Sequence, residues 1–198
     1  MANSKERLEQ QMAFVLEIDK LKNVSRQSYI VSGERKETDA EHSWHLALMS
    51  MLLGEYANEA VDMLKVMKMV LVHDLVEIDA GDTYAFDEKG NESKREREVA
   101  AAERIFNLLP TDQAAEMRCL WDEFEEGNSA EAKFANTLDK IQPAMLNAAA
   151  SGKSWREHDV RLEQILKRNE RTAEGSKALW EFTSELVDVH VQEGNIKK

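Results

Sequence analysis

Cysteine, proline and glycine are all scarce in this chain of 198 residues, which contains one cysteine, two prolines and eight glycines. The lone Cys119 excludes an internal disulfide framework and fits a protein that works in the reducing cytoplasm. Few glycines and prolines leave few positions for tight turns, and Ala, Leu, Met, Glu, Lys and Arg dominate the rest. The composition therefore indicates a helical protein, and no strand is needed to explain it.

Long hydrophobic runs and basic patches are also missing. No stretch approaches the roughly 18 apolar residues that a membrane-spanning helix needs, and the first residues lead into a charged segment rather than a signal peptide. The formal net charge of -12 argues against a nucleic acid polymer or an anionic membrane as a partner, because both would repel the protein. We expect a cytoplasmic protein that binds neither of them.

Apolar residues recur at helical spacing along almost the whole chain. The length suits one domain with a sizeable core, and no linker or repeat divides it, so we expect a single domain over residues 1–198. Helices are predicted at about 8–21, 41–56, 61–74, 93–108, 117–126, 128–145, 154–166 and 179–189, with a loop, long enough to form a lid, at 79–92. Ser93 with Glu96, and Ser154 with Glu157, have the spacing of capping boxes, and Pro143 should kink its helix.

One run, residues 70–78, interrupts an apolar helix with polar residues of the kind used in catalysis. A histidine and two carboxylates are costly to bury unless something compensates them, and a divalent cation would do so. His73, Asp74 and Glu77 can converge on one side of a helix, and the backbone freedom of Gly81 can aim Asp82 at the same place. The run therefore predicts part of a metal site.

The His-Asp dipeptide is weak evidence by itself, because it occurs a second time as His158-Asp159. That copy lies in a mixed-charge helix start, where acidic residues are favoured by the helix dipole. We interpret it as a solvated surface. His73-Asp74 differs because its neighbours are apolar and further carboxylates follow it.

Further candidate ligands lie on other predicted helices. His42 and His45 are three residues apart and share a helix face, and Asp139 lies on the apolar side of its helix. An ion pair with Lys140 or another cation is the alternative role for Asp139. Imidazole and carboxylate donors without a thiolate favour Mn²⁺, Co²⁺ or Fe²⁺ over a closed structural zinc, with Zn²⁺ or Mg²⁺ as alternatives.

The order of these residues resembles the HD-domain metal-dependent phosphohydrolases, whose pattern is H, then HD, then a distant D. Within them it is similar to the branch of bacterial 5'-deoxynucleotidases and their eukaryotic relatives. The segments that carry the resemblance are Glu41-His42-Ser43, His73-Asp74 with Glu77, Gly81-Asp82 and Asp139-Lys140. The resemblance covers nearly the whole chain and implies an all-α HD-type helical bundle that holds its metal site between helices and forms a homodimer.

Carried over residue by residue, the resemblance assigns roles to seven side chains. It implies one divalent metal ion held by His42, His73, Asp74 and Asp139. It also implies catalytic work for Glu77 and Asp82, and phosphate binding by Arg26. Arg35 and Lys36 are weaker candidates for local positive charge, and His45 becomes a core residue or a support for the ligands.

The reaction that the resemblance implies is hydrolysis of a phosphomonoester, with removal of the 5'-phosphate from a (deoxy)nucleoside 5'-monophosphate as the favoured case. The metal would bind a phosphate oxygen and a water, and Glu77 or Asp82 would position or deprotonate that water. Gln27 stands where the bacterial enzymes have a tryptophan associated with preference for deoxyribose, so the preferred sugar is open. HD subfamilies with two metals generally add histidines between the HD pair and the distant aspartate. None lies between Asp74 and Asp139 here, so the resemblance implies a single metal and a small substrate.

Two other interpretations remain. One is a phosphatase or pyrophosphohydrolase of another small phosphorylated metabolite. The other is a catalytically silent regulatory module that keeps the metal for stability. Glu77, Asp82 and Arg26 argue against the silent module, because a structural metal does not require them.

Overall fold

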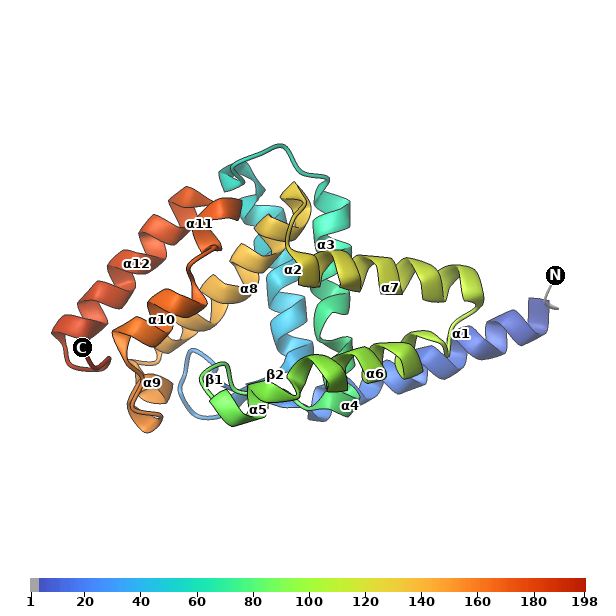
Figure 1. Ribbon diagram of the computed structural model, residues 1–198, viewed down its shortest axis with the longest axis horizontal. Helices are drawn as coiled ribbons and strands as arrows, with labels where there is room; N and C mark the ends of the chain where they lie inside the picture. The colour runs from blue at the N-terminus through green and yellow to red at the C-terminus, as the bar shows by residue number, and fades with distance from the viewer. Residues whose placement is uncertain (1–3) are drawn as a thin grey trace.

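Helix α8 (Ala130–Ala149) is the longest helix of the described residues and packs against α2 (Asp39–Leu53), α3 (Met63–Val72) and α7 (Thr111–Glu126). In the computed structural model, which describes residues 4–198 apart from the side chains of Glu88 and Asn91, α8 also contacts α11 (Thr172–Gly175) and α12 (Lys177–Gln192) (Figure 1). The remaining helices are α1 (Ser4–Ile18), α4 (Glu77–Ala80), α5 (Glu88–Glu92), α6 (Lys94–Phe106), α9 (Lys153–Glu157) and α10 (Leu162–Arg168). The predicted all-α fold is confirmed.

Short 3₁₀ turns join several of these helices, at Asp19–Asn23, Gly54–Tyr56 and His73–Val76. The turn at His73–Val76 carries two of the predicted metal ligands, His73 and Asp74. It follows α3 directly and leads into α4, so the helix predicted at 61–74 ends as an α-helix at Val72. A 3₁₀ segment between two α-helices often marks a functional position.

Two short strands occur beside the helices, although the composition required none. β1 (Ser25–Tyr29) and β2 (Lys36–Thr38) form an antiparallel hairpin in which Ser25 pairs with Thr38 and Tyr29 with Lys36. The side chains that β1 buries belong to Arg26 and Ser28. Since these are polar, the strand lacks the apolar alternation by which strands are recognised.

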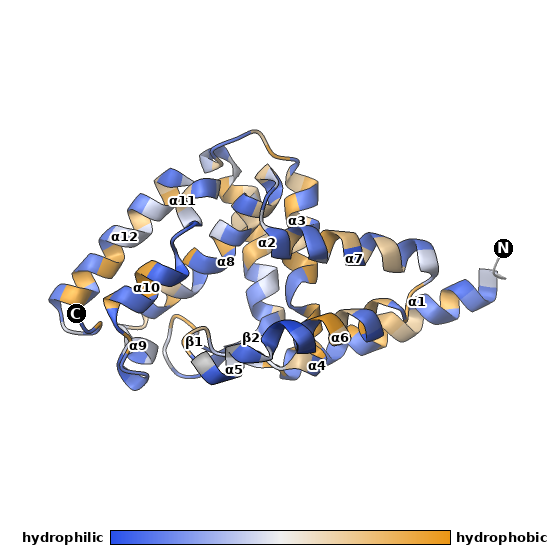
Figure 2. Ribbon diagram, viewed as in Figure 1, coloured by the Kyte–Doolittle hydropathy of each residue, from blue (hydrophilic) through white to orange (hydrophobic). Residues whose placement is uncertain are grey.

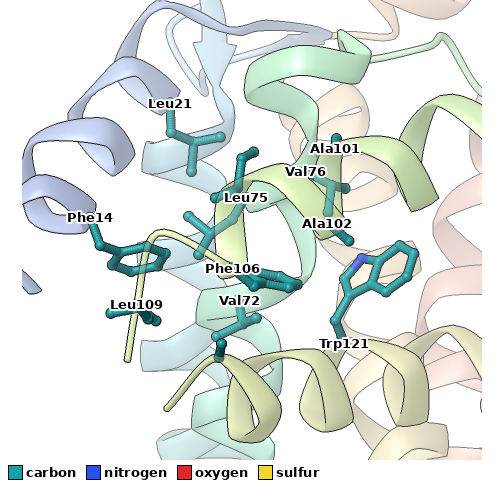
Figure 3. Packing of buried hydrophobic residues seen from close by; sticks show 12 residues of the cluster. Phe14, Leu21, Val72, Leu75, Val76, Ala101, Ala102, Phe106, Leu109 and Trp121 are labelled. Atoms are coloured by element: carbon teal, nitrogen blue, oxygen red, sulfur yellow. The ribbon is translucent and has the colours of Figure 1, made fainter. Parts of the chain in front are cut away.

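The helices carry hydrophilic and hydrophobic residues in alternation, as amphipathic helices do (Figure 2). Their apolar sides form three clusters, and α3 contributes residues to two of them. One cluster contains Val72, Leu75 and Val76, packed with residues of α1, α6 and α7 such as Phe14, Phe106 and Trp121 (Figure 3). A second contains Met69 and Val70 of α3 with residues of α2 and α8. Burial of each large apolar side chain contributes about 1.5–3 kcal/mol, so Leu75 and Val76 anchor the turn in the first cluster, while Met69 and Val70 anchor α3 in the second.

The helix starts differ from the two predicted capping boxes. A capping box does form at α2, where Thr38 and Glu41 exchange hydrogen bonds. Ser93 precedes α6 without capping it and instead accepts a hydrogen bond from Arg97. Ser154 lies buried inside α9, so the second predicted box is also wrong.

The loop predicted at 79–92 is interrupted by helical residues at both ends. α4 extends to Ala80, and α5 covers Glu88–Glu92. One continuous helix, α8, passes through Pro143. Across residues 4–198, no helix combines the length and the apolar character needed to cross a membrane.

Candidate active site

The structure brings together all four side chains that the sequence predicted as metal ligands. His42 comes from α2, His73 and Asp74 from the 3₁₀ turn, and Asp139 from α8. Oδ1 of Asp139 lies 3.0 Å from Nε2 of His42 and 3.7 Å from Nε2 of His73. The Asp74 carboxylate lies 3.1 Å from His73 Nε2 and 3.9 Å from His42 Nε2. The candidate ligand atoms of His42, His73 and Asp139 lie within 4.8 Å of one another around one point, and the Asp74 carboxylate adjoins both histidines.

Hydrogen bonds on the far side of each ring turn both Nε2 atoms toward this point. Nδ1 of His73 donates to the carbonyl oxygen of Val70 at 3.0 Å, and Nδ1 of His42 lies 3.0 Å from Oε1 of Gln142. The Gln142 oxygen is the acceptor, because its Nε2 donates to the Glu37 carboxylate at 2.7 Å. With Nδ1 donating away from the cluster, Nε2 of each ring faces the cluster and can ligate a metal that displaces any proton there.

The buried charges of the cluster also favour a bound cation. Nε2 of His73 is buried and has no hydrogen-bond partner among residues 4–198. Burial acts to lower the pKa of His73, but the carboxylates of Asp74 and Asp139 outweigh it and raise this pKa to about 10. Burial, together with Arg26, lowers the pKa of His42 to about 4. Lone pairs and carboxylates that converge in this way fit a divalent metal ion.

His45 supports the cluster from behind. Its Nδ1 lies 3.2 Å from Nε2 of Gln142, the same nitrogen that donates to Glu37. This position matches the expectation that His45 is a core or supporting residue rather than a ligand.

Arg26 lies beside the cluster and connects it to a second buried carboxylate. Its Nη1 donates to Asp74 at 2.8 Å and to Asp39 at 3.0 Å, and its Nε lies 3.9 Å from Glu37. Burial and the nearby Asp74 raise the pKa of Asp39 to about 8, although Arg26 opposes this. Sequence reasoning missed Asp39 and Glu37. The sequence did carry a signal: Glu37, Asp39 and Glu41 place an acidic residue at every second position up to His42.

A cleft opens from the cluster. Its lining includes the predicted residues Arg26, Asp74, Glu77, Asp82 and Asp139. Gly81, at φ +75, allows the turn that carries Asp82 to this wall. Burial raises the pKa of the Asp82 carboxyl, and Arg26 opposes that rise.

Glu77 is buried at the edge of this cleft, and its Oε2 has no hydrogen-bond partner in the described part of the chain. Burial and the nearby Asp74 raise its pKa to about 9. Lys94, which the sequence reading missed, lies 3.8 Å from Glu77 Oε1 and 3.2 Å from Glu98. In the sequence, Lys94 and Glu98 have only the spacing of an ordinary surface ion pair on a helix.

Two further cations line the cleft. Lys140 and Arg168 form no ion pair or hydrogen bond within the described residues 4–198. Asp139 faces the histidines, so the alternative of an ion pair with Lys140 is not what the structure has. Unpaired cations in a cleft favour an anionic ligand.

The remaining candidates lie outside the site. Arg35 makes hydrogen bonds of 2.8 and 2.6 Å to Glu41, and Lys36 donates to Gln27. The second His-Asp pair is on the surface, as predicted: both residues are exposed, and Asp159 pairs with Lys197 at 2.5 Å.

The bundle and its buried cluster define a helical metal-binding domain. Comparison with known proteins makes this class specific: the chain belongs to the HD domain family, whose model matches residues 18–180. The family resemblance seen in the sequence is therefore confirmed, and the cluster implies a divalent metal.

A solved structure described as a predicted metal-dependent phosphohydrolase from Magnetospirillum magnetotacticum MS-1 is 47% identical, with a TM-score of 0.94, and each chain covers 100% of the other. Human 5'-deoxynucleotidase HDDC2 is 32% identical over 132 residues, which are 66% of this chain and 63% of the human protein. The Dictyostelium discoideum protein of that name is 34% identical over 130 residues, 62% of this chain and 68% of that protein. The match thus spans less than two thirds of the human relative.

An HD-domain phosphohydrolase from Listeria innocua shares the fold at 18% identity, with a TM-score of 0.62 over 94% of this chain and 92% of the other.

Proposed function

We propose that the protein is a metal-dependent phosphomonoesterase that removes the 5'-phosphate from nucleoside 5'-monophosphates. The observation that carries the proposal is that Glu77 and Arg26 line the same cleft as the predicted ligands Asp74 and Asp139, with Arg26 2.8 Å from Asp74. A purely structural metal would need neither a buried carboxyl with an unpartnered oxygen nor an arginine at the cleft wall. The names of the relatives, 5'-deoxynucleotidase and metal-dependent phosphohydrolase, support the same activity.

The ligands His42, His73, Asp74 and Asp139 would hold the metal. A divalent cation there would supply Lewis acidity, lowering the pKa of a water and offsetting negative charge on the phosphate. The mixed nitrogen and oxygen donors favour Mn²⁺, Co²⁺ or Fe²⁺, with Zn²⁺ and Mg²⁺ as alternatives.

The residues around the metal site would bind the phosphate and transfer protons. Nη2 of Arg26, which makes no hydrogen bond to the described residues, donates to a phosphate oxygen, while Nη1 stays with Asp74 and Asp39. The unpartnered Oε2 of Glu77 orients the attacking water or exchanges a proton with the leaving 5'-oxygen. Asp82 faces the same space and shares this proton transfer. Lys140 and Arg168 offset the charge of the bound phosphate.

Turnover assays test the proposal directly. The purified protein is assayed against ribo- and deoxyribonucleoside 5'-monophosphates with Mn²⁺, Co²⁺ or Mg²⁺, and after chelation. We expect metal-dependent phosphate release, which His73→Ala and Asp139→Ala abolish. Asp159→Asn is the matched control, since it changes the other His-Asp pair at an exposed residue that pairs with Lys197, and it should leave activity intact. Phosphatase activity that survives in the His73→Ala variant or in the metal-free protein contradicts the proposed site.

A second candidate is a pyrophosphohydrolase, favoured by the two unpaired cations Lys140 and Arg168. A substrate with two or three phosphates would use more positive charge than one phosphate group needs. Adding nucleoside di- and triphosphates to the panel separates the candidates, because a pyrophosphohydrolase prefers them and releases pyrophosphate or a shortened nucleotide.

The homodimer belongs to the same proposal. Four large apolar residues on α2 are exposed at helical spacing: Trp44, Leu48, Met51 and Leu52. Trp44 is 61% exposed. An apolar stripe of this kind on a folded domain suits an interface with a second copy. Analytical ultracentrifugation should give a dimer for the unaltered protein and a monomer for Trp44→Glu; a monomeric unaltered protein contradicts it.

A further inference from the structure

Helix α8 lines the cleft along more than two turns. Asp139 stands at the metal end, Pro143 and Ala144 follow, and Asn147 lies eight residues beyond Asp139, all of them on the cleft wall. Eight residues of α-helix correspond to about 12 Å of axial rise. That separation is comparable with the distance from the phosphate to the base in a nucleoside monophosphate.

Asn147 is buried without a hydrogen-bond partner. Its side chain forms no hydrogen bond with any residue that the structure describes, although the residue is only 7% exposed and its Oδ1 is fully buried. Leaving such a polar atom unpaired typically costs about 1–3 kcal/mol. A cost of this size in a preformed cleft is explained when a ligand supplies the missing partner.

Asn169 shows that the fold can satisfy an asparagine at this cleft. It also lines the wall and is 5% exposed, yet its Nδ2 donates to Ile165 at 2.9 Å and its Oδ1 accepts from Thr172 at 3.1 Å. Of these two asparagines on the cleft wall, the described residues satisfy the side chain of Asn169 and leave that of Asn147 unpaired.

The surroundings of Asn147 are mostly apolar and aromatic. Trp155 and Ile165 are buried in the same wall, and Tyr84 and Phe86 stand edge to face with ring centres 5.3 Å apart. The Ser154 hydroxyl is already hydrogen-bonded to Tyr84. Apolar walls with one uncommitted amide are typical of pockets in which a few polar groups fix the orientation of an organic ligand.

We propose that Asn147 is a specificity-determining residue whose carboxamide hydrogen-bonds the nucleoside part of the substrate while the phosphate lies at the metal end. This inference rests on the proposed function and names the part of the substrate that α8 recognises. A half-turn of the amide presents either its N–H or its carbonyl to the cleft, so it can match a donor or an acceptor on a base edge or a sugar hydroxyl.

Binding measurements isolate this role from catalysis. In a metal-loaded Glu77→Gln background, calorimetry compares 2'-deoxyadenosine 5'-monophosphate with inorganic phosphate, with and without Asn147→Leu. We expect the nucleotide affinity to fall about tenfold, the equivalent of 1.4 kcal/mol, and the phosphate affinity to stay the same. Equal nucleotide affinities, or an equal loss for phosphate, overturn the inference.

An abasic ligand identifies the contacted group. When 2-deoxyribose 5-phosphate loses affinity to the same extent as the nucleotide, the partner of Asn147 is the sugar hydroxyl. When it loses none, the partner is the base. Both results support recognition of the nucleoside.

Thermal unfolding of the metal-loaded protein separates recognition from a structural role. Asn147→Leu should keep or raise the melting temperature, because no hydrogen bond is lost. The matched control Asn169→Leu removes two hydrogen bonds and should lower it. A melting temperature for Asn147→Leu that falls as far as that of the control shows a structural amide and overturns the inference.

The proposed function and this inference fail in different ways. An unaltered protein that hydrolyses no nucleoside monophosphate contradicts the function, while the binding comparison still tests Asn147. A protein that hydrolyses nucleotides equally well with and without Asn147→Leu contradicts the inference alone.

Discussion

Gln142 fixes the imidazole of His42 in one orientation. Its Oε1 accepts from Nδ1 of His42 at 3.0 Å, and its Nε2 donates to Glu37 at 2.7 Å. Because Glu37 can only accept when ionised, it determines which end of the Gln142 amide faces the histidine. The lone pair of His42 is in this way directed at the centre of the cluster by a residue on a different helix.

We expect Gln142→Leu to weaken metal binding about 10- to 100-fold, the usual effect of removing a group that orients a ligating histidine. Leucine fills similar space but leaves the His42 ring free to rotate. Competition with a chromogenic chelator measures the change. Gln113→Leu, on α7 and remote from the cluster, is the matched control and should bind metal like the unaltered protein. Equal affinities for all three proteins contradict this role.

The helical fold and the polar residues proposed as ligands were visible in the sequence, because each leaves a local pattern there. His73 and Asp74 interrupt an apolar run, and helical periodicity covers most of the chain. Their meeting point was not predictable from spacing, since it depends on how α2 and α8 pack against α3. Periodicity carries no information on how these helices pack, so only the resemblance to a family indicated that the residues meet.

The hairpin and the residues around the proposed ligands could not be predicted from the sequence, for a physical reason. β1 buries polar side chains, so its pattern does not read as a strand, although it is this strand that carries Arg26 to the cluster. Asp39 and Lys94 likewise look like ordinary helix-end charges. Their burial beside the site arises from tertiary contacts that no local pattern encodes.

Glu77→Gln should lower kcat by about 10²- to 10⁴-fold, the range expected for loss of a positioned acid or base. The amide keeps the shape of the side chain and its place beside Lys94 but cannot exchange a proton. KM should change little, since Arg26 and the metal still bind the phosphate. Steady-state kinetics with the best substrate of the panel give both constants.

The exposed Glu103→Gln on the same helix as Lys94 is the control for the loss of one carboxylate. A Glu77→Gln protein that keeps full kcat would assign the proton transfer elsewhere, with Asp82 the next residue to replace.

The α2 capping box gives a pH-dependent prediction. Hydrogen bonds from Arg35 and from the Thr38 backbone lower the pKa of Glu41 from 4.5 to about 2. A folded-state pKa below the unfolded one means that the stabilisation is complete above about pH 4.5 and is lost as the pH falls toward 2. Glu41→Ala should therefore destabilise the protein by about 1 kcal/mol at neutral pH, a value limited by solvent screening.

Denaturant unfolding at several pH values measures this difference. The gap between Glu41→Ala and the unaltered protein should be constant near neutrality and narrow below pH 4.5. Glu41→Gln, which can still accept the capping hydrogen bond, should recover part of the loss. A gap that does not change with pH would show that the charge of Glu41 contributes nothing.

The contact between α11 and α8 depends on Gly175. A β-carbon at this position would overlap the backbone carbonyl of Lys133 on α8, and a backbone atom cannot rotate away. Gly175→Ala should therefore push the two helices apart and destabilise the fold by about 1–3 kcal/mol. Since α8 also carries Asp139, six residues after Lys133, metal affinity should fall with stability.

Gly54→Ala is the matched control, because its added carbon meets only the flexible end of Met63. Unfolding and metal titration of both variants test the coupling: a Gly175→Ala protein that loses stability but binds metal normally would show that the displacement stops before Asp139.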